Sequence, residues 1–471
     1  MSRLSLTALT LAGALAGCAA VGPDYRLPGQ AALNRPAAAA PFQSAGNAAV
    51  SAEPLPAGWW RLYRDDRLNG LVEQALAANA GIRVAAANLR KALAVETGVD
   101  AERGPHAAVS AAIQRSQESG EAFLLEQKLP VVNAGDVGLS IGYQIDLFGK
   151  LQRAEEAARA GAEANAAAAD LARVTVAAET VRAYVQGCSA GHQLAVARHE
   201  LELQNRGVDV ARRLLAAGRG RTTDLTRAQA QADALRANLP RFLAEQDAAR
   251  FRLAALLGKA PAELPPAAVA CAAEPVLAQP LPVGDGAALL KRRPDVREAE
   301  RRLAAATARI GVATAELYPS VTLGASAGYT GLLEHVGEAR AEHWGLGPLI
   351  SWTIPDGGAR ARVKAARADA DAELARFDGV VLNALRETET ALSLYANDLQ
   401  RNADLRAARD KARSAAGDNR RLYAAGRAPY LSSLDADRVL AGSEAALAAS
   451  DAQLAQDRVN LFLALGGGWE R

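Results

Sequence analysis

The chain has 471 residues, enough for two or three ordinary domains or for one long repeated architecture. Aromatic residues make up 4% of it and the formal net charge is +2, so neither a basic nor an acidic excess is present. No cluster of Lys and Arg resembles a nucleic-acid patch, and we expect no nucleic-acid partner. The composition indicates a chain that is mainly α-helical and rich in alanine.

Residues 1–17 have the pattern of a secretory signal peptide. Arg3 precedes an apolar run that is too short to span a bilayer as a helix. The four residues that end at Cys18, Leu-Ala-Gly-Cys, resemble the bacterial lipobox, in which the cysteine becomes the lipidated first residue. We predict lipidation of Cys18 and a lipidated N-terminal tether over residues 18–62. The alternative is an ordinary secretory signal followed by an incidental cysteine.

Two nine-residue segments of the chain agree at seven of their nine positions. The sequence RRLLAAGRG begins at Arg212 and RRLYAAGRA begins at Arg420, so the offset is 420 − 212 = 208 residues. At this offset, 15 of the 47 positions over residues 212–258 are identical without a gap. Self-similarity of this kind predicts a duplicated architecture.

The repeat extends upstream of these segments. The offset of 208 also pairs Gly149 with Gly357, but nearer the N-terminus the offset becomes 214 and pairs Leu89 with Leu303. The first copy must therefore contain a loop six residues longer than its counterpart, between Pro105 and Gly149.

We divide the mature chain into two copies, residues 63–258 and 284–466. A Pro-rich connector at 259–283 joins them, and a tail follows at 467–471. Each copy is expected to contain a helical segment, a β-hairpin, a long helix and a short helix, in that order.

Each copy begins with a helical segment that ends shortly before a proline. The segments are Leu71–Arg103, before Pro105, and Leu289–Leu317, before Pro319. Pro294 is expected in a first helical turn, where its missing N–H has no cost.

Period-two alternation of apolar and small or polar residues follows in both copies. It is clear over Val137–Ile145 and Val321–Tyr329, and weaker over Ala107–Ile113 and Trp344–Ile354. The pattern predicts four strands, two in each copy. Four strands are too few to close a barrel, and a membrane does not tolerate open sheet edges. Either the sheet packs on the helices of a soluble protein, or several chains pool their strands.

A long helix without proline follows each hairpin, over Gly149–Gly218 and Gly357–Gly426. About 69 residues at ~1.5 Å each give a helix of ~100 Å. Shorter helices are expected over Thr222–Gly258 and Ser432–Leu465. The first long helix carries two apolar ladders with a seven-residue spacing, which are Leu194, Leu201, Val208 and Leu215, and Val196, Leu203 and Val210. The ladders lie about 200° apart, so this helix is expected to have a neighbour on each side, as in a closed ring.

No pattern in the chain indicates catalysis, a cofactor or a metal. The five histidines are scattered, and the Cys188–His192 pair at one helical turn is too little for a metal site. The glycines at 466–468 lack the Lys and Ser or Thr of a phosphate loop. Cys188 and Cys271, 83 residues apart, could form a disulfide in an oxidising compartment, but the sequence does not decide this.

Four motifs resemble those of the bacterial outer membrane factors, the TolC/OprM-type exit ducts of tripartite efflux systems, and are closest to their lipoprotein branch. The motifs are CAAVGPDY at 18–25, GWWRLYRDDRLNGLVEQAL at 58–76, RRPDVREAERRL at 292–303 and ALGGGW at 464–469. Together with the duplicated strand and helix order, the resemblance covers essentially the whole mature chain.

The resemblance implies a homotrimer in which each chain contributes four strands to a shared 12-stranded transmembrane β-barrel. The tandem helical hairpins would form a periplasmic α-barrel, with the connector around its middle. The implied function is a passive outer-membrane duct that docks with a periplasmic adaptor and an inner-membrane pump and exports small molecules. The implied location is the bacterial outer membrane, with lipid and other copies as further partners. Alternatives are a type I protein-secretion outlet and a non-channel coiled-coil structural lipoprotein.

In that family the turns from the long to the short helices close the tunnel and meet the adaptor. Family acidic gate positions fall on Asp224 and Asp435, while a second acid of the second turn is replaced by Ser432 and a basic gate partner by Ala428. Both aspartates are also expected in a first helical turn, where a carboxylate is favoured without any gate role. Adaptor docking is expected at four turn residues, of which the glycines should also adopt a left-handed backbone; they are Gly218, Arg219, Gly426 and Arg427.

Overall fold

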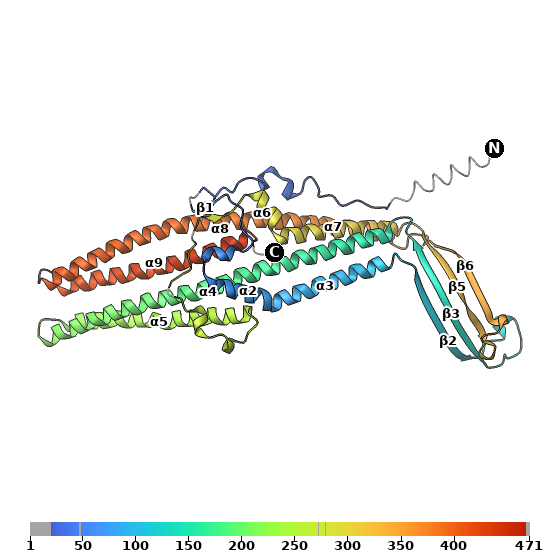
Figure 1. The fold of residues 1–471 in the computed structure, drawn as a ribbon, viewed down its shortest axis with the longest axis horizontal. Helices are drawn as coiled ribbons and strands as arrows, with labels where there is room; N and C mark the ends of the chain where they lie inside the picture. The colour runs from blue at the N-terminus through green and yellow to red at the C-terminus, as the bar shows by residue number, and fades with distance from the viewer. Residues whose placement is uncertain (1–19, 47–48, 272, 278, 468–471) are drawn as a thin grey trace. The chain divides into compact units, whose positions relative to one another are not determined.

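The computed structural model describes residues 20–46, 49–271, 273–277 and 279–467. Its helices form two sets, one in each copy of the repeat (Figure 1). The first set is α2 Asp66–Ala78, α3 Ala80–Ala101, α4 Lys150–Ala216 and α5 Thr222–Leu256. The second set is α6 Gly286–Arg292, α7 Pro294–Ala315, α8 Ala359–Ala424 and α9 Tyr430–Ala464. Among the described residues, none of these helices combines the length and the hydropathy needed to cross a bilayer.

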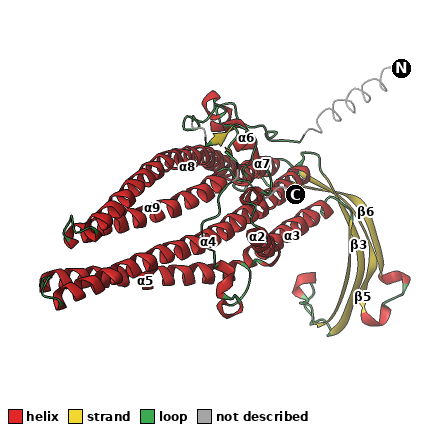
Figure 2. Ribbon diagram, turned by 60° about the vertical axis from the view of Figure 1, so that its left-hand side comes forward, coloured by secondary structure: helices red, strands yellow, loops and turns green. Residues whose placement is uncertain are grey.

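Four strands form one antiparallel sheet in the order β2-β3-β5-β6, which curves in Figure 2. The strands are β2 His106–Ser116, β3 Val132–Ile145, β5 Ser320–Leu332 and β6 Glu342–Ser351. All four overlap the predicted strands. The connections at 117–131 and 333–341 have 15 and 9 residues, so the six extra residues of the first copy lie in this loop. Two short strands, β1 Val50–Ser51 and β4 Leu281–Pro282, pair in parallel elsewhere.

One face of the four-stranded sheet is apolar across its whole width. The register places Val109 opposite Leu139, Leu139 opposite Ala327 and Ala327 opposite Trp344. Val109 is 78% exposed and Trp344 is 82% exposed. The next row of partners, Ser110, Gly138, Gly328 and His343, is small or polar and belongs to the other face. A single chain therefore leaves an extended apolar surface uncovered.

The chain divides into two compact units. Of the described residues, one unit contains those within 20–28, 88–165 and 298–377, and the other contains those within 29–87, 166–297 and 378–467. In the first unit the N-terminal segment lies on the helices, because the buried Arg153 guanidinium pairs with Asp24 at 2.7 Å and its Nε donates to the carbonyl of Val21 at 3.2 Å. Tyr25 packs there against a small alanine cluster of Ala160, Ala304 and Ala305.

The core of the second unit is centred on the aromatic segment at Trp59–Tyr63. Trp59 and Phe462 are fully buried and stack with ring centroids 4.2 Å apart. Val181 of α4 and Leu253 of α5, which are also fully buried, belong to the same core. The motif at 58–76 therefore joins the middle of the long helix to the ends of both short helices.

The prediction of one continuous helical segment at the start of each copy was wrong. The first segment breaks at Asn79 and the second at Arg293, which are equivalent positions because 293 − 79 = 214. The Asn79 side chain donates to the carbonyl of Leu256 at 3.0 Å, and Arg293 donates to the carbonyl of Ala464 at 2.7 Å. These carbonyls are equivalent as well, since each ends a short helix. Each break thus places a polar side chain over a helix C-terminus whose carbonyls lack partners.

The long helices agree with the prediction, with 67 residues in α4 and 66 in α8. Of the two ladders on α4, Leu194 and Val208 are buried, whereas Val196, Leu203 and Val210 are half-exposed. One predicted face of α4 is therefore covered within the chain and the other only partly.

Candidate functional site

The two hairpin turns, from α4 to α5 and from α8 to α9, begin with the same backbone motif. Gly218 and Gly426 have φ values of 69° and 68°, which confirms the predicted left-handed conformation. The next amide bonds back to the last helical turn: Arg219 donates to the carbonyl of Leu214 at 2.9 Å, and Arg427 donates to that of Leu422 at 2.8 Å. The glycine amides donate as well, Gly218 to the carbonyl of Leu215 at 3.0 Å and Gly426 to that of Tyr423 at 2.9 Å, so each turn satisfies two of the carbonyls that a helix end leaves free.

The turns diverge immediately after these residues. A Cβ on Gly220 would lie 2.9 Å from the amide nitrogen of Leu215, so the first turn has no room for a side chain there. The second turn has Ala428 at the equivalent position and Pro429 as the N-cap residue of α9. Arg219 and Arg427 are exposed in both turns. The two turns therefore share a helix end but present different surfaces beyond it.

The predicted gate residues do not occupy equivalent places. Asp224 lies in the first turn of α5, as expected. Asp435 does not lie in a first turn, because α9 already begins at Tyr430. It is exposed and pairs with Arg438 at 2.9 Å, one turn further along the helix. Ser432 lies in the first turn of α9, and its amide donates to the carbonyl of Pro429 at 3.1 Å.

Tyr430 connects the two hairpins near their turns, a contact that the sequence did not predict. Its hydroxyl donates to the carbonyl of Gly207, near the C-terminal end of α4, at 2.6 Å. A Cβ on Gly207 would lie 2.9 Å from this hydroxyl oxygen, so the glycine admits the tyrosine. Burial raises the pKa of Tyr430 to about 12, and the phenol stays a hydrogen-bond donor at neutral pH. Gly207, a glycine within a helical pattern, is a signal that could have drawn attention to this place, although α4 contains other glycines.

A small apolar cluster lies behind this hydrogen bond. Val208 and Ala211 of α4 and Ala228 and Ala232 of α5 are buried, and Tyr430 packs against them. In the second hairpin, Arg420 of the repeated segment pairs with Asp437 at 2.7 Å. The equivalent Arg212 pairs instead with Asp209 of its own helix at 2.6 Å, because Gln229 stands where the second copy has Asp437.

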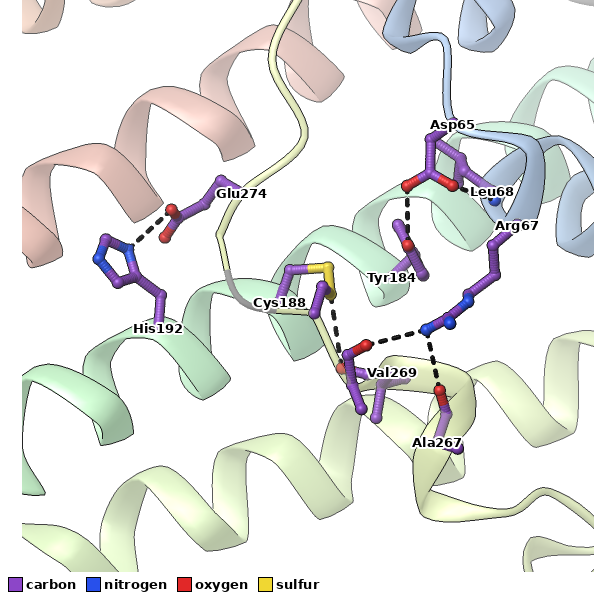
Figure 3. Close-up of a disulfide and its surroundings, with 11 residues drawn as sticks. Asp65, Arg67, Leu68, Tyr184, Cys188, His192, Ala267, Val269 and Glu274 are labelled. Atoms are coloured by element: carbon purple, nitrogen blue, oxygen red, sulfur yellow. Dashed lines mark hydrogen bonds and ion pairs between the residues drawn. A yellow bond between two sulfur atoms is a disulfide. The ribbon is translucent and has the colours of Figure 1, made fainter.

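A disulfide, an ion pair and hydrogen bonds hold the connector, residues 259–283, against the first set of helices (Figure 3). Cys188 and Cys271 form a disulfide with their Cα atoms 5.0 Å apart, which answers the question that the sequence left open. A Cβ on Gly187 would lie 2.7 Å from Cβ of Val269, so the connector is seated directly on the helix. Arg67 of α2 donates to the carbonyls of Ala267 and Ala270 at 3.0 and 2.8 Å.

An ion pair stands one helical turn beyond the disulfide. His192 Nδ1 lies 2.8 Å from an oxygen of Glu274, which is almost fully buried (Figure 3). The hydrogen bond with Glu274 raises the pKa of His192 above its ordinary 6.5. Burial acts to raise the pKa of Glu274, but the hydrogen bonds to its carboxylate outweigh burial and the pKa lies below the ordinary 4.5. We call Cys188, His192, Cys271 and Glu274 the connector clasp.

The clasp explains the Cys188–His192 spacing without a metal. Cys188 and His192 are four residues apart on α4, and their partners Cys271 and Glu274 are three residues apart on the connector. The disulfide and the ion pair therefore lie next to each other. Among the described residues, no group of three or more His, Cys, Asp and Glu side chains is placed to hold a metal ion.

The chain matches the family model described as "Outer membrane efflux protein" over residues 71–259 and 287–467. It belongs to that family. The two matched segments cover most of the chain and fall on the two sets of helices and strands, with the connector between them.

Relatives and solved structures agree with this assignment along nearly the whole chain. Nodulation protein T of Rhizobium leguminosarum bv. viciae is 29% identical over 470 residues, covering 100% of this chain and 94% of that protein. SilC of Salmonella typhimurium, named a probable outer membrane lipoprotein, is 27% identical, with 100% of both chains covered. The structure of the outer-membrane channel OprN superposes with a TM-score of 0.89 at 36% identity and covers 95% of this chain and 99% of that one.

Membership of the family places this efflux protein in the bacterial outer membrane, extending into the periplasm, with a transport function. The proteins that it resembles are efflux channels rather than enzymes.

Replacing either turn glycine by alanine should destabilise its hairpin. No atom lies within 4 Å of a Cβ built on Gly218 or Gly426, so the cost is that of a left-handed backbone alone, about 1–2 kcal/mol. Gly442→Ala, inside α9 and equally open, is the matched control and should stabilise by about 0.5–1 kcal/mol. Denaturant unfolding followed by circular dichroism measures both. Equal stabilisation by all three changes would contradict the turn assignment.

The connector clasp should make stability depend on pH through His192. Because the pKa of His192 is raised in the folded state, its contribution is complete below about pH 6.5 and disappears as the pH rises through the folded pKa. The contribution of Glu274, whose pKa is lowered, is present above about 4.5 and lost in stronger acid. His192→Gln should therefore lower the melting temperature at pH 6 but hardly at pH 9. The control His199→Gln, also on α4, should show no such difference; a deficit for His192→Gln that is the same at both pH values rules out the ion pair.

Proposed function

We propose that this protein is the passive outer-membrane exit duct of a tripartite efflux system and exports small toxic molecules, drugs among them. The observation that carries the proposal is the sheet β2-β3-β5-β6. It has one exposed apolar face, and within the described part of the chain no strand pairs with the outer edge of β2 or of β6. A surface of this kind suits lipid on the apolar face and water on the polar one.

In the proposed assembly, three copies pool their strands into a 12-stranded barrel. Four strands cannot close on themselves, whereas pairing β2 of one copy with β6 of the next removes every open edge. Each of the two repeat copies, 63–258 and 284–466, supplies one hairpin of strands to the barrel and one hairpin of helices to a periplasmic tunnel. The number three rests on the resemblance to outer membrane factors.

The hairpin turns form the proposed periplasmic rim. Three copies would place six turns in a ring, alternating between the two versions, with Asp224, Asp435 and Ser432 toward the aperture. Rings of carboxylates favour cations and can take part in holding an aperture closed. Gly218, Arg219, Gly426 and Arg427 form the proposed docking surface for a periplasmic adaptor.

Opening is proposed as a shift of the hairpins relative to one another that the adaptor stabilises. An adaptor can shift this equilibrium only by its differential affinity for the open state. The hydrogen bond between Tyr430 and Gly207 and the cluster behind it are the contacts between the hairpins at this level, and they favour the arrangement seen here. The duct itself uses no nucleotide; the inner-membrane pump supplies the energy.

Lipid anchoring is proposed at Cys18, which lies outside the described residues, as does Trp469 of the C-terminal motif. Export of small molecules, rather than of protein, is supported by the match of the N-terminal motifs to the lipoprotein branch. Genes for an adaptor and a pump beside this one would separate efflux from a type I secretion outlet.

Removing the two gate carboxylates should open the rim. The double change Asp224→Ala and Asp435→Ala is expected to raise the single-channel conductance of the purified protein in planar bilayers, because two rings of charge are lost from the aperture. Antibiotic leakage into cells should rise in parallel. Asp247→Ala, an exposed aspartate of α5 paired with Arg250, is the control and should leave the conductance unchanged.

Two outcomes count against the proposal. Unaltered conductance and leakage in the double variant would exclude these aspartates from the gate. A wild-type protein that forms no channel at all and dissociates to monomers after mild detergent extraction would instead favour the structural lipoprotein.

A further inference from the structure

A cavity lies at the end of the sheet where the strands connect to the helices. Figure 1 shows β3 leading into α4 and β6 leading into α8 at this end, and α7 leads into β5 here as well. The cavity has a volume of about 400 Å³, and residues within 144–150, 315–320 and 351–362 line it. All of them belong to the same compact unit. The volume falls in the ~300–1,000 Å³ range of small-ligand sites.

The cavity adjoins the apolar face of the sheet. Ile145 is the last apolar position of β3, and Trp352, the residue after β6, continues the alternation of that strand. Trp352 is 58% exposed, and its Nε1 donates to the carbonyl of Leu317 at 3.2 Å. Tyr318, which is 42% exposed, stacks on Phe148 with ring centroids 4.6 Å apart. Exposed Trp and Tyr side chains at the end of an apolar surface are typical of the level of the lipid headgroups.

Two cations in the cavity share one carboxylate. Lys150 Nζ lies 3.4 Å from a carboxylate oxygen of Glu316, and Arg362 Nε donates to the other oxygen at 2.6 Å. Burial acts to raise the pKa of Glu316, but the hydrogen bond from Arg362 and the charges of both cations outweigh burial, and the pKa lies below the ordinary 4.5. The side chains of Lys150 and Arg362 are about half exposed. Because an ammonium has three donors and a guanidinium five, both retain donors for a further anion.

Two more carboxylates line the same cavity. Asp146 accepts the amide of Gln152 at 2.9 Å, and Asp356 accepts the amide of Gly358 at 3.2 Å, so each is held at the start of a long helix. Asp356 also pairs with Arg360 at 3.3 Å, but the side chain of Arg360 is 83% exposed and such a surface pair is weak. The cavity therefore offers charges of both signs.

We propose that this cavity binds the headgroup of a zwitterionic phospholipid that carries a phosphate and a primary ammonium. The phosphate lies against Lys150 and Arg362. The ammonium lies against Asp146 and Asp356, and the acyl chains run along the apolar face beyond Trp352. A simple anion meets repulsion from the carboxylates and a simple cation meets repulsion from the basic groups, whereas a ligand with both charges finds a partner for each.

The occupant is a membrane lipid because the cavity continues into the apolar face of the sheet. The long helices α4 and α8 begin here, so the site belongs to the periplasmic side of the membrane. The inference rests on the proposed duct in one respect, which is that the apolar face lies in lipid. It goes beyond the duct because an apolar face alone is covered equally well by any phospholipid and gives no preference among headgroups.

Native mass spectrometry of the full chain tests the proposal. The protein is released from nanodiscs that contain equal parts of phosphatidylethanolamine, phosphatidylcholine and phosphatidylglycerol, and the lipids that stay bound are identified. We expect bound phosphatidylethanolamine to be enriched over the other two. The methyl groups of choline remove the N–H donors that the aspartates need, and phosphatidylglycerol has no cation.

Removing the two cations should weaken binding of the phosphate. Lys150→Gln combined with Arg362→Gln is expected to lower the retained phosphatidylethanolamine about fivefold for each cation removed. The matched control is Lys364→Gln with Arg367→Gln, two exposed residues of α8, which removes the same charge and should leave retention unchanged.

A second variant covers the case in which the loss of both cations prevents folding. In Asp356→Asn the amide oxygen can still accept the N–H of Gly358, but no negative charge is left for an ammonium. The enrichment of phosphatidylethanolamine over phosphatidylcholine should fall several-fold while the total bound lipid stays the same. Asp371→Asn, which changes an exposed carboxylate of α8, is the control and should keep the enrichment.

The outcomes separate this inference from the proposed function. A protein that conducts in planar bilayers but retains the three lipids in the proportions supplied overturns the headgroup site and leaves the duct standing. An equal loss of phosphatidylethanolamine in the cation variant and in its control also overturns the site, because it shows attraction by overall charge alone. A protein that neither enters nanodiscs nor conducts overturns both.

Discussion

The backbone of the four-stranded sheet imposes the constraint on which the rest of the structure depends. The outer edges of β2 and β6 have no strand partner among the described residues of the chain, and one face of the sheet is apolar from Val109 to Trp344. Unpaired N–H and C=O groups cost several kcal/mol each in a hydrocarbon environment. In the proposed assembly, other copies supply the missing strands, and the duplicated helices form a ring of the same symmetry.

The two repeat copies use the same local structures at their helix breaks and at their hairpin turns. The breaks at Asn79 and Arg293 place different side chains over equivalent carbonyls, those of Leu256 and Ala464. Both hairpin turns close with a left-handed glycine and the same backward hydrogen bonds. The two repeat copies differ at contacts that one of them makes and the other does not. Tyr430 reaches Gly207 without a counterpart, and the disulfide fastens the connector to the first long helix alone.

Local pattern was enough to predict the regular parts of the fold. The long helices follow from stretches without proline, the strands from strict alternation, and the longer hairpin loop from the change of offset. Contacts between distant segments were not accessible in this way. Nothing around Asn79 indicates that a carbonyl 177 residues away will need its amide, and the helix therefore seemed continuous. Asp435 was misplaced because the start of α9 depends on Pro429, a boundary that apolar periodicity alone does not locate. The pairing of Cys188 with Cys271 could not be predicted, because it depends on the path that the connector takes over α4.

Hydrogen–deuterium exchange of the strand amides in nanodiscs tests the central claim most directly. If copies of this chain pair their outer strands, the amides of β2 and β6 will be protected as strongly as those of the inner strands β3 and β5. Rapid exchange along β2 and β6, with β3 and β5 protected, would show that the edges stay open and would contradict the account.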